Sequence, residues 1–289
     1  WMSEYFWSVD TFITIANEIP ALAVMAVGMT FVLIIAGIDL SVGSVMALSA
    51  ATSAAAILQW HWPVPAAAAL ALLTGLVCGT ITGAISVAWR LPSFIVSLGM
   101  LEAVRGSAYL VTDSRTQYVG DAISWLAAPF LGGISVAFLI AVALVVVAQL
   151  VLTRTVFGRS VVGIGTNEEA MRLAGVDPRP VRIIVFALTG LMAGLAGLMQ
   201  SARLEAADPN GGTGVELQVI AAVVIGGTSL MGGRGSVVNT AFGVLIIAVL
   251  EAGLAQVGAS EPSKRIITGI VIVAAVIVDT LRQRRAAKA

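Results

Sequence analysis

The sequence predicts an all-α protein, a polytopic bundle of transmembrane helices that forms one domain over residues 1–289. Composition is the first reason: hydrophobic residues make up 58% of the chain, charged residues 11%, and the mean hydropathy is +0.99. Soluble domains carry roughly 25% charged residues, so this chain has too few charges to cover a surface that faces water. The second reason is that apolar segments close to the ~20 residues that cross a bilayer recur along the whole chain.

These apolar segments predict about nine spans. Their ranges are 21–38, 41–59, 66–88, 94–111, 133–152, 183–202, 215–230, 237–258 and 264–281. The segments at 21–38 and 215–230 end in Gly-rich turns, where we expect broken or short helices. Residue 1 is Trp rather than Met, so we expect one further helix upstream and about ten spans in the full-length protein.

Basic residues predict the orientation of the bundle, because cytoplasmic loops carry an excess of Lys and Arg. We place the basic C-terminal tail and the loop 153–182 in the cytoplasm and count the crossings. Eleven basic residues then lie inside: Arg90, Arg154, Arg159, Arg172, Arg179, Arg182, Arg234, Arg282, Arg284, Arg285 and Lys288. Four lie outside or at the outer rim: Arg115, Arg203, Lys264 and Arg265. This bias predicts a cytoplasmic loop 153–182 and a cytoplasmic C-terminus.

Small residues recur at four-residue spacing in two of the predicted spans, as Gly75, Gly79 and Gly83 and as Gly190 and Gly194. In lipid, close approach of backbones drives helix pairing. The spacing therefore predicts tight helix packing, with a hinge as the alternative.

Several kinds of chemistry are excluded for the chain itself. Its only lysines, Lys264 and Lys288, do not follow a Gly-rich loop, so there is no Walker A motif and no expected ATP site. His61 lies between Trp60 and Trp62, a pattern typical of an interfacial anchor. No cluster of His, Cys and carboxylates suggests a metal site, and a net charge of zero suggests no nucleic-acid partner. We expect a chain without catalytic activity and without a cofactor.

The first polar interruption is the stretch Ala36-Gly37-Ile38-Asp39-Leu40-Ser41-Val42-Gly43-Ser44 between two apolar segments. Asp39 and Ser41 are suited to cap the next helix, and Gly37 and Gly43 permit a tight turn. Two interpretations remain open, a capped helical hairpin and a broken helix beside a transport pathway.

The second interruption covers 226–236 and is predicted on the same face. It is rich in glycine, with Gly226, Gly227, Gly232, Gly233, Arg234 and Gly235 as its motif residues. The two interruptions are candidates for equivalent positions in an internal repeat.

The third feature is a short isolated helix in the loop 153–182. Thr166 or Asn167 is the expected N-cap, Glu168 and Glu169 suit the positive end of the helix dipole, and Gly175 is the expected stop. The helix itself contains Ala170, Met171, Arg172 and Leu173. Because so short a helix is unstable alone, it must dock. Met171 and Leu173 are available to a partner, and the alternative is packing on this chain's own helix ends.

Polar residues inside the spans are candidates for a translocation path, since charges at membrane depth usually face a cavity or a partner. Glu102 and Arg105 are three residues apart and are expected to pair on one helix face. The other candidates for the path are Asn17, Phe94, Ser97, Gln200 and Glu251.

Taken together, these motifs resemble those of the permease subunit of ribose/xylose/galactose-type sugar ABC importers, in the binding-protein-dependent inner membrane transport family. The resemblance is carried by the turn at 37–44, by 163–175, by 226–236 and by the outer segment 202–214. It covers essentially the whole chain. One departure is Ala36, where many relatives have a second Gly.

The resemblance implies import of a monosaccharide or sugar-like solute across a bacterial inner membrane. It implies a second permease copy or paralogue, an extracytoplasmic sugar-binding protein, and a cytoplasmic ABC ATPase that docks on 167–174 and holds the ATP and Mg. An amino-acid or urea permease of the same superfamily is one alternative. An ion-coupled secondary transporter and an intramembrane enzyme are alternatives from other classes.

Overall fold

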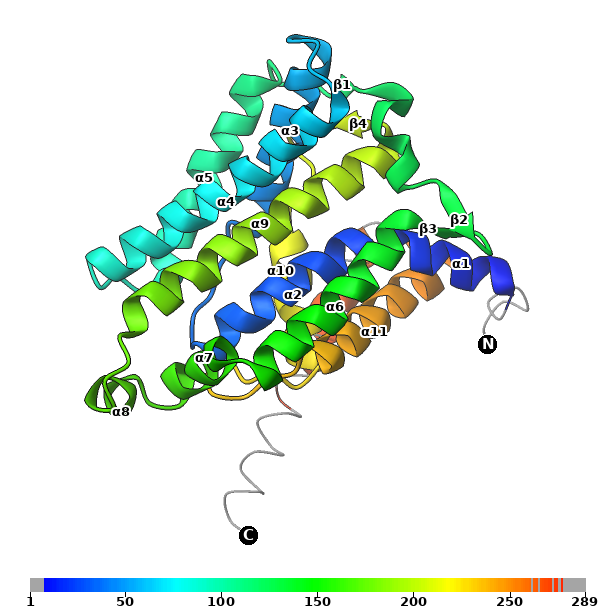
Figure 1. Cartoon of the computed structure of the whole chain (residues 1–289). Coiled ribbons are helices and arrows are strands. Elements are labelled where there is room, and N and C mark those ends of the chain that lie inside the picture. Colours follow the sequence, from blue (N-terminus) through cyan, green and yellow to red (C-terminus); the bar gives the residue numbers. More distant parts are fainter. Residues whose placement is uncertain (1–7, 261, 265, 272, 275–276, 278–289) are drawn as a thin grey trace.

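The computed structural model describes residues 8–260, 262–264, 266–271, 273–274 and 277, and helices dominate this part of the chain (Figure 1). Helices α1 (Val9–Glu18) and α2 (Pro20–Ile34) come first and meet at a bend of 51°. Pro20 accounts for the bend, because proline fits the first turn of a helix but cannot continue the preceding one.

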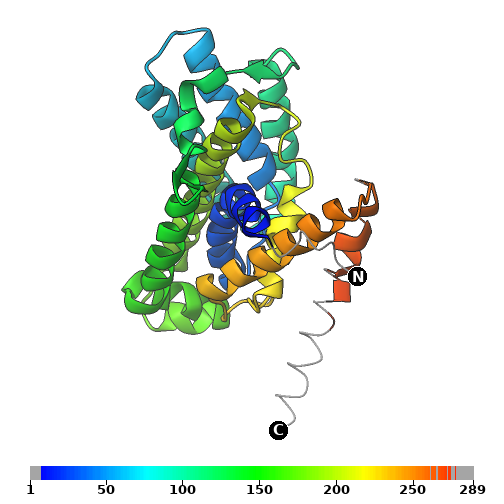
Figure 2. The ribbon, with the colours of Figure 1, turned by 90° about the vertical axis from the view of Figure 1, so that its right-hand side faces the viewer.

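Helix α2 lies in the centre of the bundle. All of its residues except Leu22 are buried, and a helix that is apolar on every side is expected to be buried on every side. Figure 2 looks nearly along α1 and α2 and shows the other helices around them. The irregular segment 36–44, which follows α2, therefore starts from a helix in the middle of the molecule.

Three helices follow: α3 (Val42–Leu58), α4 (Val64–Ala88) and α5 (Ser93–Val111). Proline marks two of their starts, with Pro63 and Pro92 at the N-caps of α4 and α5. Between α3 and α4 the rings of Trp60 and Trp62 lie 5.3 Å apart, and both side chains are exposed. This exposure fits the predicted interfacial anchor.

One end of the bundle carries short irregular elements. These are β1 (Gln117–Tyr118), the 3-10 helix η2 (Gly120–Leu126), β2 (Pro129–Leu131) and β3 (Ile134–Ser135). Strand β2 pairs antiparallel with β3, and β1 pairs antiparallel with the later β4 (Ala206–Ala207), in the register Gln117↔Ala207 and Tyr118↔Ala206. We call this end the cap end.

Helix α6 (Val136–Arg154) runs from the cap end to the opposite end, where α7 (Val156–Thr166) and α8 (Glu168–Leu173) lie (Figure 1). We call this opposite end the α8 end. Helix α9 (Pro178–Leu204) returns to the cap end. Helix α10 (Val215–Ile225) and the Gly-rich turn then lead to α11 (Val237–Gln256).

The predicted packing of the glycine-rich spans is confirmed. A Cβ atom at Gly75 would overlap the carbonyl oxygen of Gly190, and one at Gly190 would overlap the carbonyl oxygen of Gly75. Gly79 makes a similarly close contact with the carbonyl of Phe186. Helices α4 and α9 therefore pack backbone against backbone, as small residues allow in lipid.

Fewer complete spans than predicted are found in the part of the chain that the structure describes. Within the described residues, five helices are long and apolar enough to cross a membrane: α4, α5, α6, α9 and α11. A sixth span is present if α1 and α2 count as one. Helix α3 has 17 residues and α10 has 11, so at 1.5 Å per residue α10 extends only about 16 Å, roughly half of a bilayer core. Both follow irregular segments, which explains why continuous apolar sequence overestimates the spans.

Within the predicted helix at 264–281, the described residues 264, 266–271, 273–274 and 277 are all helical, and the others lie outside the described residues. The basic tail from 281 to 288 lies wholly outside them.

Candidate functional site

The short helix α8 forms as the sequence predicts. Asn167 is the N-cap, and its Oδ1 accepts a hydrogen bond from the Ala170 N–H at 2.9 Å. Glu168 and Glu169 occupy the first turn, and Glu168 pairs with Arg172 one turn later at 2.7 Å. Gly175 follows with a φ of +83°, a conformation that glycine adopts without strain. Local capping signals therefore account for both ends of α8.

The two apolar side chains of α8 have different surroundings. Leu173 is 83% exposed. Met171 packs on the chain's own α7, where its sulfur would lie 2.5 Å from a Cβ at Gly163. The expectation that both side chains face a partner is therefore wrong for Met171. Leu173 remains available to a partner, and the neighbouring residues Glu169, Ala170 and Arg172 are exposed as well.

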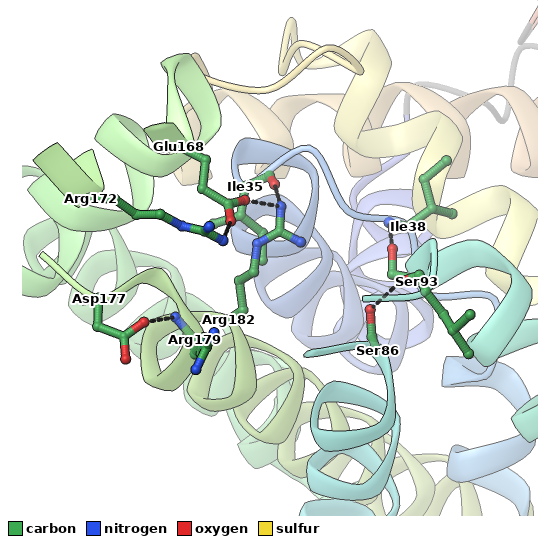
Figure 3. Close-up of polar contacts among 10 residues, drawn as sticks. Ile35, Ile38, Ser86, Ser93, Glu168, Arg172, Asp177, Arg179 and Arg182 are labelled. Atoms are coloured by element: carbon green, nitrogen blue, oxygen red, sulfur yellow. Dashed lines mark hydrogen bonds and ion pairs between the residues drawn. The ribbon is translucent and has the colours of Figure 1, made fainter. Parts of the chain in front are cut away.

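Arg182 ties α8 to the membrane helices (Figure 3). It lies in the second turn of α9, and its Nη2 contacts the Glu168 carboxylate at 3.1 Å. The same nitrogen donates to the carbonyl oxygen of Ile35, just after α2, at 3.2 Å. One guanidinium therefore links α8, α9 and the end of the central helix.

A second connection is made by backbone alone, at a place we call the inner junction. It consists of Ile34–Ala36, Gly165–Thr166 and Gly232–Gly233. The Gly233 N–H donates to the Ile34 carbonyl at 2.8 Å. A Cβ at Gly165 would overlap the Ile34 carbonyl oxygen, and one at Gly232 would lie 2.9 Å from the Cβ of Ala36. The end of α7, the end of α2 and the Gly-rich turn therefore meet directly before α8.

The glycines of the Gly-rich turn at 226–236 are required for two reasons: some have a backbone conformation that favours glycine, and others leave no space for a side chain. Gly227, Gly232 and Gly233 have positive φ, and Gly226 and Gly235 lie against Asn239 and Ile34. Ser236 then caps α11 through the Asn239 N–H. Arg234 and Met231 are exposed, Met231 to 84%. The structure thus brings both predicted interruptions together, since Ala36 contacts Gly232.

The first interruption is an irregular segment rather than a capped hairpin. Ser41 is the N-cap residue of α3, but its side chain makes no capping hydrogen bond. Its N–H and hydroxyl instead donate to Oδ1 of the buried Asp39, at 2.9 and 2.6 Å. Ser41 therefore occupies the predicted N-cap position, but the predicted capping hydrogen bond is not formed, because the Ser41 hydroxyl is engaged by the Asp39 carboxylate. Two serines of α5 accept from the segment's backbone, Ser93 from the Ile38 N–H and Ser97 from the Leu40 N–H.

A matching irregular segment, 208–214, leads into α10 and is held by α5. Arg105 Nη1 donates to the carbonyl oxygens of Pro209 and Gly211 at 2.6 and 2.7 Å. The Tyr109 hydroxyl donates to Asn210 Oδ1 at 2.6 Å. The predicted pair between Glu102 and Arg105 is not formed, because the guanidinium turns to these carbonyls and the Glu102 side chain is exposed.

The two irregular segments meet inside the bundle. One arrives from the α8 end and the other from the cap end, since α9 ends there (Figure 1). A Cβ at Gly43 would overlap the carbonyl oxygen of Gly212 and lie 2.6 Å from Glu216 Oε2. The N-termini of α3 and α10 therefore face one contact region, an arrangement that places the positive ends of two half-helices together.

A polar cavity of about 290 Å³ opens beside this meeting point. Its polar lining is Glu18, Gln200, Arg203, Gln218 and Glu251. The Gln218 side chain donates to the Glu251 carboxylate at 2.8 Å, and Arg203 contacts Glu18 at 3.6 Å. A neighbouring cavity of about 450 Å³ shares Glu18, Gln218 and Glu251. The structure thus brings together two of the predicted path residues, Gln200 and Glu251.

The sequence matches the family described as "Branched-chain amino acid transport system / permease component" over residues 11–276. This match covers most of the chain. The chain belongs to this permease family.

Curated relatives have more specific names. The chain is 38% identical to the ribose import permease protein RbsC of Escherichia coli K12, over 98% of this chain and 89% of the relative. It is 37% identical to RbsC of Bacillus subtilis, over 92% and 84%, and 33% identical to the fructose import permease protein FrcC of Rhizobium meliloti, over 95% and 79%. No solved structure shows a significant match.

The remaining predicted path residues of the permease lie elsewhere. The Asn17 side chain bonds at both ends to the β2–β3 hairpin, through the Gly133 carbonyl at 2.9 Å and the Ser135 N–H at 2.8 Å. Ser97 is buried against the segment before α3, and Phe94 and Glu102 are exposed on α5. None of the four lines the 290 Å³ cavity.

Sequence reasoning missed several residues that position the permease's site, among them Arg182 and Gln218, and it gave Arg105 the wrong partner. An available signal for Arg105 was its place in an apolar span, where a charge needs a specific partner. For Gln218 and Arg182 no local signal exists, because their partners lie far away in the sequence.

Arg105 gives a prediction about the permease. Replacing it with Gln removes charge-assisted hydrogen bonds to two carbonyls, each worth ~1.5–3 kcal/mol. We expect the thermal midpoint of the purified chain to fall and its uptake activity to drop at least about tenfold. The control is Glu102→Gln. It removes the charge of the residue that was predicted to pair with Arg105 but does not, so it should leave the thermal midpoint and the uptake near wild type. Equal effects of the two substitutions would contradict the assignment.

Proposed function

We propose that this chain is the membrane-spanning permease subunit of an ABC transporter that imports a monosaccharide or sugar-like solute. The observation that carries the proposal is α8: a capped, six-residue helix with an exposed Leu173, joined to the membrane helices by Arg182. The relatives named as ribose and fructose import permeases support the sugar class over the amino-acid class.

The proposed mechanism is mechanical. A separate cytoplasmic ATPase binds ATP and Mg and receives α8, with Leu173 buried in its surface. When two ATPase subunits close, α8 moves, and its motion reaches α9 through the Glu168–Arg182 contact. It reaches α2 and the start of α11 through the inner junction, where backbones touch without intervening side chains. ATP then supplies the differential free energy between two packings.

The solute route is proposed to include the 290 Å³ cavity. Gln200, Gln218 and Glu251 offer amide and carboxylate groups that match sugar hydroxyls, and Met25 and Met46 supply apolar lining. The cavity is also lined by Glu18, the last residue of α1, and by Arg203, in the last turn of α9, the helix that ends at the cap end. An extracytoplasmic binding protein is therefore proposed to deliver solute at that end.

The remaining assignments are proposed on the same basis. The chain forms one domain of a bacterial inner membrane protein, pairs with a second permease copy or paralogue, and keeps its C-terminus in the cytoplasm. The basic residues of the loop 153–182 support a cytoplasmic position for α8.

The test is to extract the protein gently from its native membrane and identify what co-purifies by mass spectrometry. We expect a cytoplasmic ABC ATPase in stable complex. The complex, reconstituted in liposomes with its binding protein, should take up a labelled monosaccharide only when ATP is supplied, and should not take up branched-chain amino acids. A chain that is reproducibly isolated alone and transports with ATP depleted would instead be an ion-coupled transporter.

A further inference from the structure

A further polar cavity lies at the α8 end, and the proposed solute route does not include it. Its volume is about 330 Å³. It lies between α8, the start of α9 and the loop joining α4 to α5, a region shown in Figure 3. Its lining residues are mostly polar, and five are charged: Arg90, Arg172, Arg179, Arg182 and Glu168.

The charge of this cavity is unbalanced. Four arginines face one glutamate, which leaves three net positive charges in the lining. Glu168 is already shared between Arg172 and Arg182. Asp177 is nearby, but the contact of its carboxylate is with the backbone N–H of Arg179 (Figure 3). No ion pair is found for the side chains of Arg90 and Arg179 among the described residues.

Arg182 contributes a partly buried guanidinium to this lining, with a side-chain exposure of 24%. Its Nη2 is already engaged by Glu168 and by the Ile35 carbonyl, so the surplus positive charge is carried mainly by Arg90 and Arg179. A cavity with surplus guanidinium groups is suited to an anion with several oxygens, and arginine recognises phosphate well because of its planar fork of donors.

The surroundings indicate that the phosphate belongs to a lipid. The α4–α5 loop beside the cavity exposes Trp89 to 69% and Leu91 to 44%, and the first turn of α5 exposes Phe94 and Ile95. Tryptophan at the end of an apolar helix is typical of the membrane interface. An acyl chain can therefore lie along α5 while its headgroup enters the basic cavity.

We propose that this cavity binds the phosphate group of an anionic phospholipid from the cytoplasmic leaflet. Basic pockets between helix ends on this side of a membrane are suited to such headgroups. Arg90 and Arg179 hold the phosphate, and through Arg172 and Arg182 the bound lipid sets the position of α8. The leaflet assignment rests on the proposed cytoplasmic position of α8.

The test is native mass spectrometry of the purified full-length chain in detergent, titrated with phosphatidylglycerol or phosphatidylcholine. We expect one phosphatidylglycerol to bind at least about tenfold more tightly than phosphatidylcholine. The double variant Arg90→Gln/Arg179→Gln should lose this preference, since each basic residue adds to the attraction of an anionic lipid. The matched control is Arg154→Gln/Arg159→Gln, which removes two exposed arginines at the same end but outside the cavity, and it should keep the preference.

Three outcomes would overturn the proposal. Equal binding of the two lipids, or equal loss in both double variants, would mean that the cavity is not a lipid site. Inorganic phosphate that displaces the lipid at equal concentration would identify a site for the free anion. Unselective lipid binding together with loss of ATPase association in Arg90→Gln/Arg179→Gln would assign the arginines to the protein partner.

A separate measurement distinguishes failure of this proposal from failure of the proposed function. A membrane-impermeant thiol reagent is applied to cells that carry Ala174→Cys or Ser114→Cys, with the buried Cys78 as a silent background. Labelling of Cys at 174 from outside would place α8 outside and contradict the coupling function and the leaflet. The affinity for anionic lipid in detergent would be unaffected by that result.

Discussion

Replacing Leu173 with Asp should abolish ATP-driven solute uptake while leaving the permease folded in the membrane. Leu173 is 83% exposed, so its side chain adds little to the stability of this chain. In the proposed complex the same side chain is buried against the ATPase, and burying an aspartate there without a partner is costly. We expect uptake by the reconstituted complex to fall at least about a hundredfold, with membrane abundance unchanged.

The control for this prediction is Leu204→Asp. Leu204 is also an exposed leucine, but it ends α9 at the cap end, far from α8. It should retain ATP-dependent uptake. Leu173→Ala should lie between Asp and wild type, because it shortens the contact without adding charge. Normal uptake by Leu173→Asp would remove the coupling assignment of α8, whatever the other results.

The helices could largely be predicted because their signals are local. Apolar segments bounded by Gly and Pro place α4, α5 and α11 within a few residues of their observed bounds. Helix α7 was missed, since its 11 residues mix glycines with polar side chains and it lies outside the spans. The short α10 begins at residue 215 as predicted, but it ends at Ile225 rather than at 230, because the Gly-rich turn starts at Gly226.

The candidate site likewise has a part that could be predicted from local sequence and a part that could not. The caps of α8 depend on residues within one turn, so Asn167 and Gly175 were recognised from sequence. The contacts that connect α8 to the bundle depend on distant backbone carbonyls, such as that of Ile35 for Arg182. Every residue has a carbonyl, so sequence cannot tell which one lies free at a helix end. The mistaken pairing of Arg105 has this cause.

Replacing Gly190 with Val should prevent accumulation of folded permease. A Cβ at this position would overlap the carbonyl oxygen of Gly75 and lie 2.8 Å from the backbone nitrogen of Gly79. Both neighbours are backbone atoms of α4, so no side chain can move aside. The two helices must separate, which also opens the contact between Gly79 and Phe186.

The expected loss is ~3 kcal/mol or more, at the upper end for overpacked cores and a large fraction of the ~5–15 kcal/mol of a typical domain. The measurements are the yield of membrane-inserted protein and the thermal midpoint of the purified chain. The matched control is Gly106→Val on α5, because this glycine is also helical but a Cβ there would meet nothing within 4 Å. The two substitutions share the same change of helix propensity, so the difference between them measures the α4–α9 contact alone. Similar thermal midpoints for both would show that α4 and α9 do not depend on backbone contact at this position.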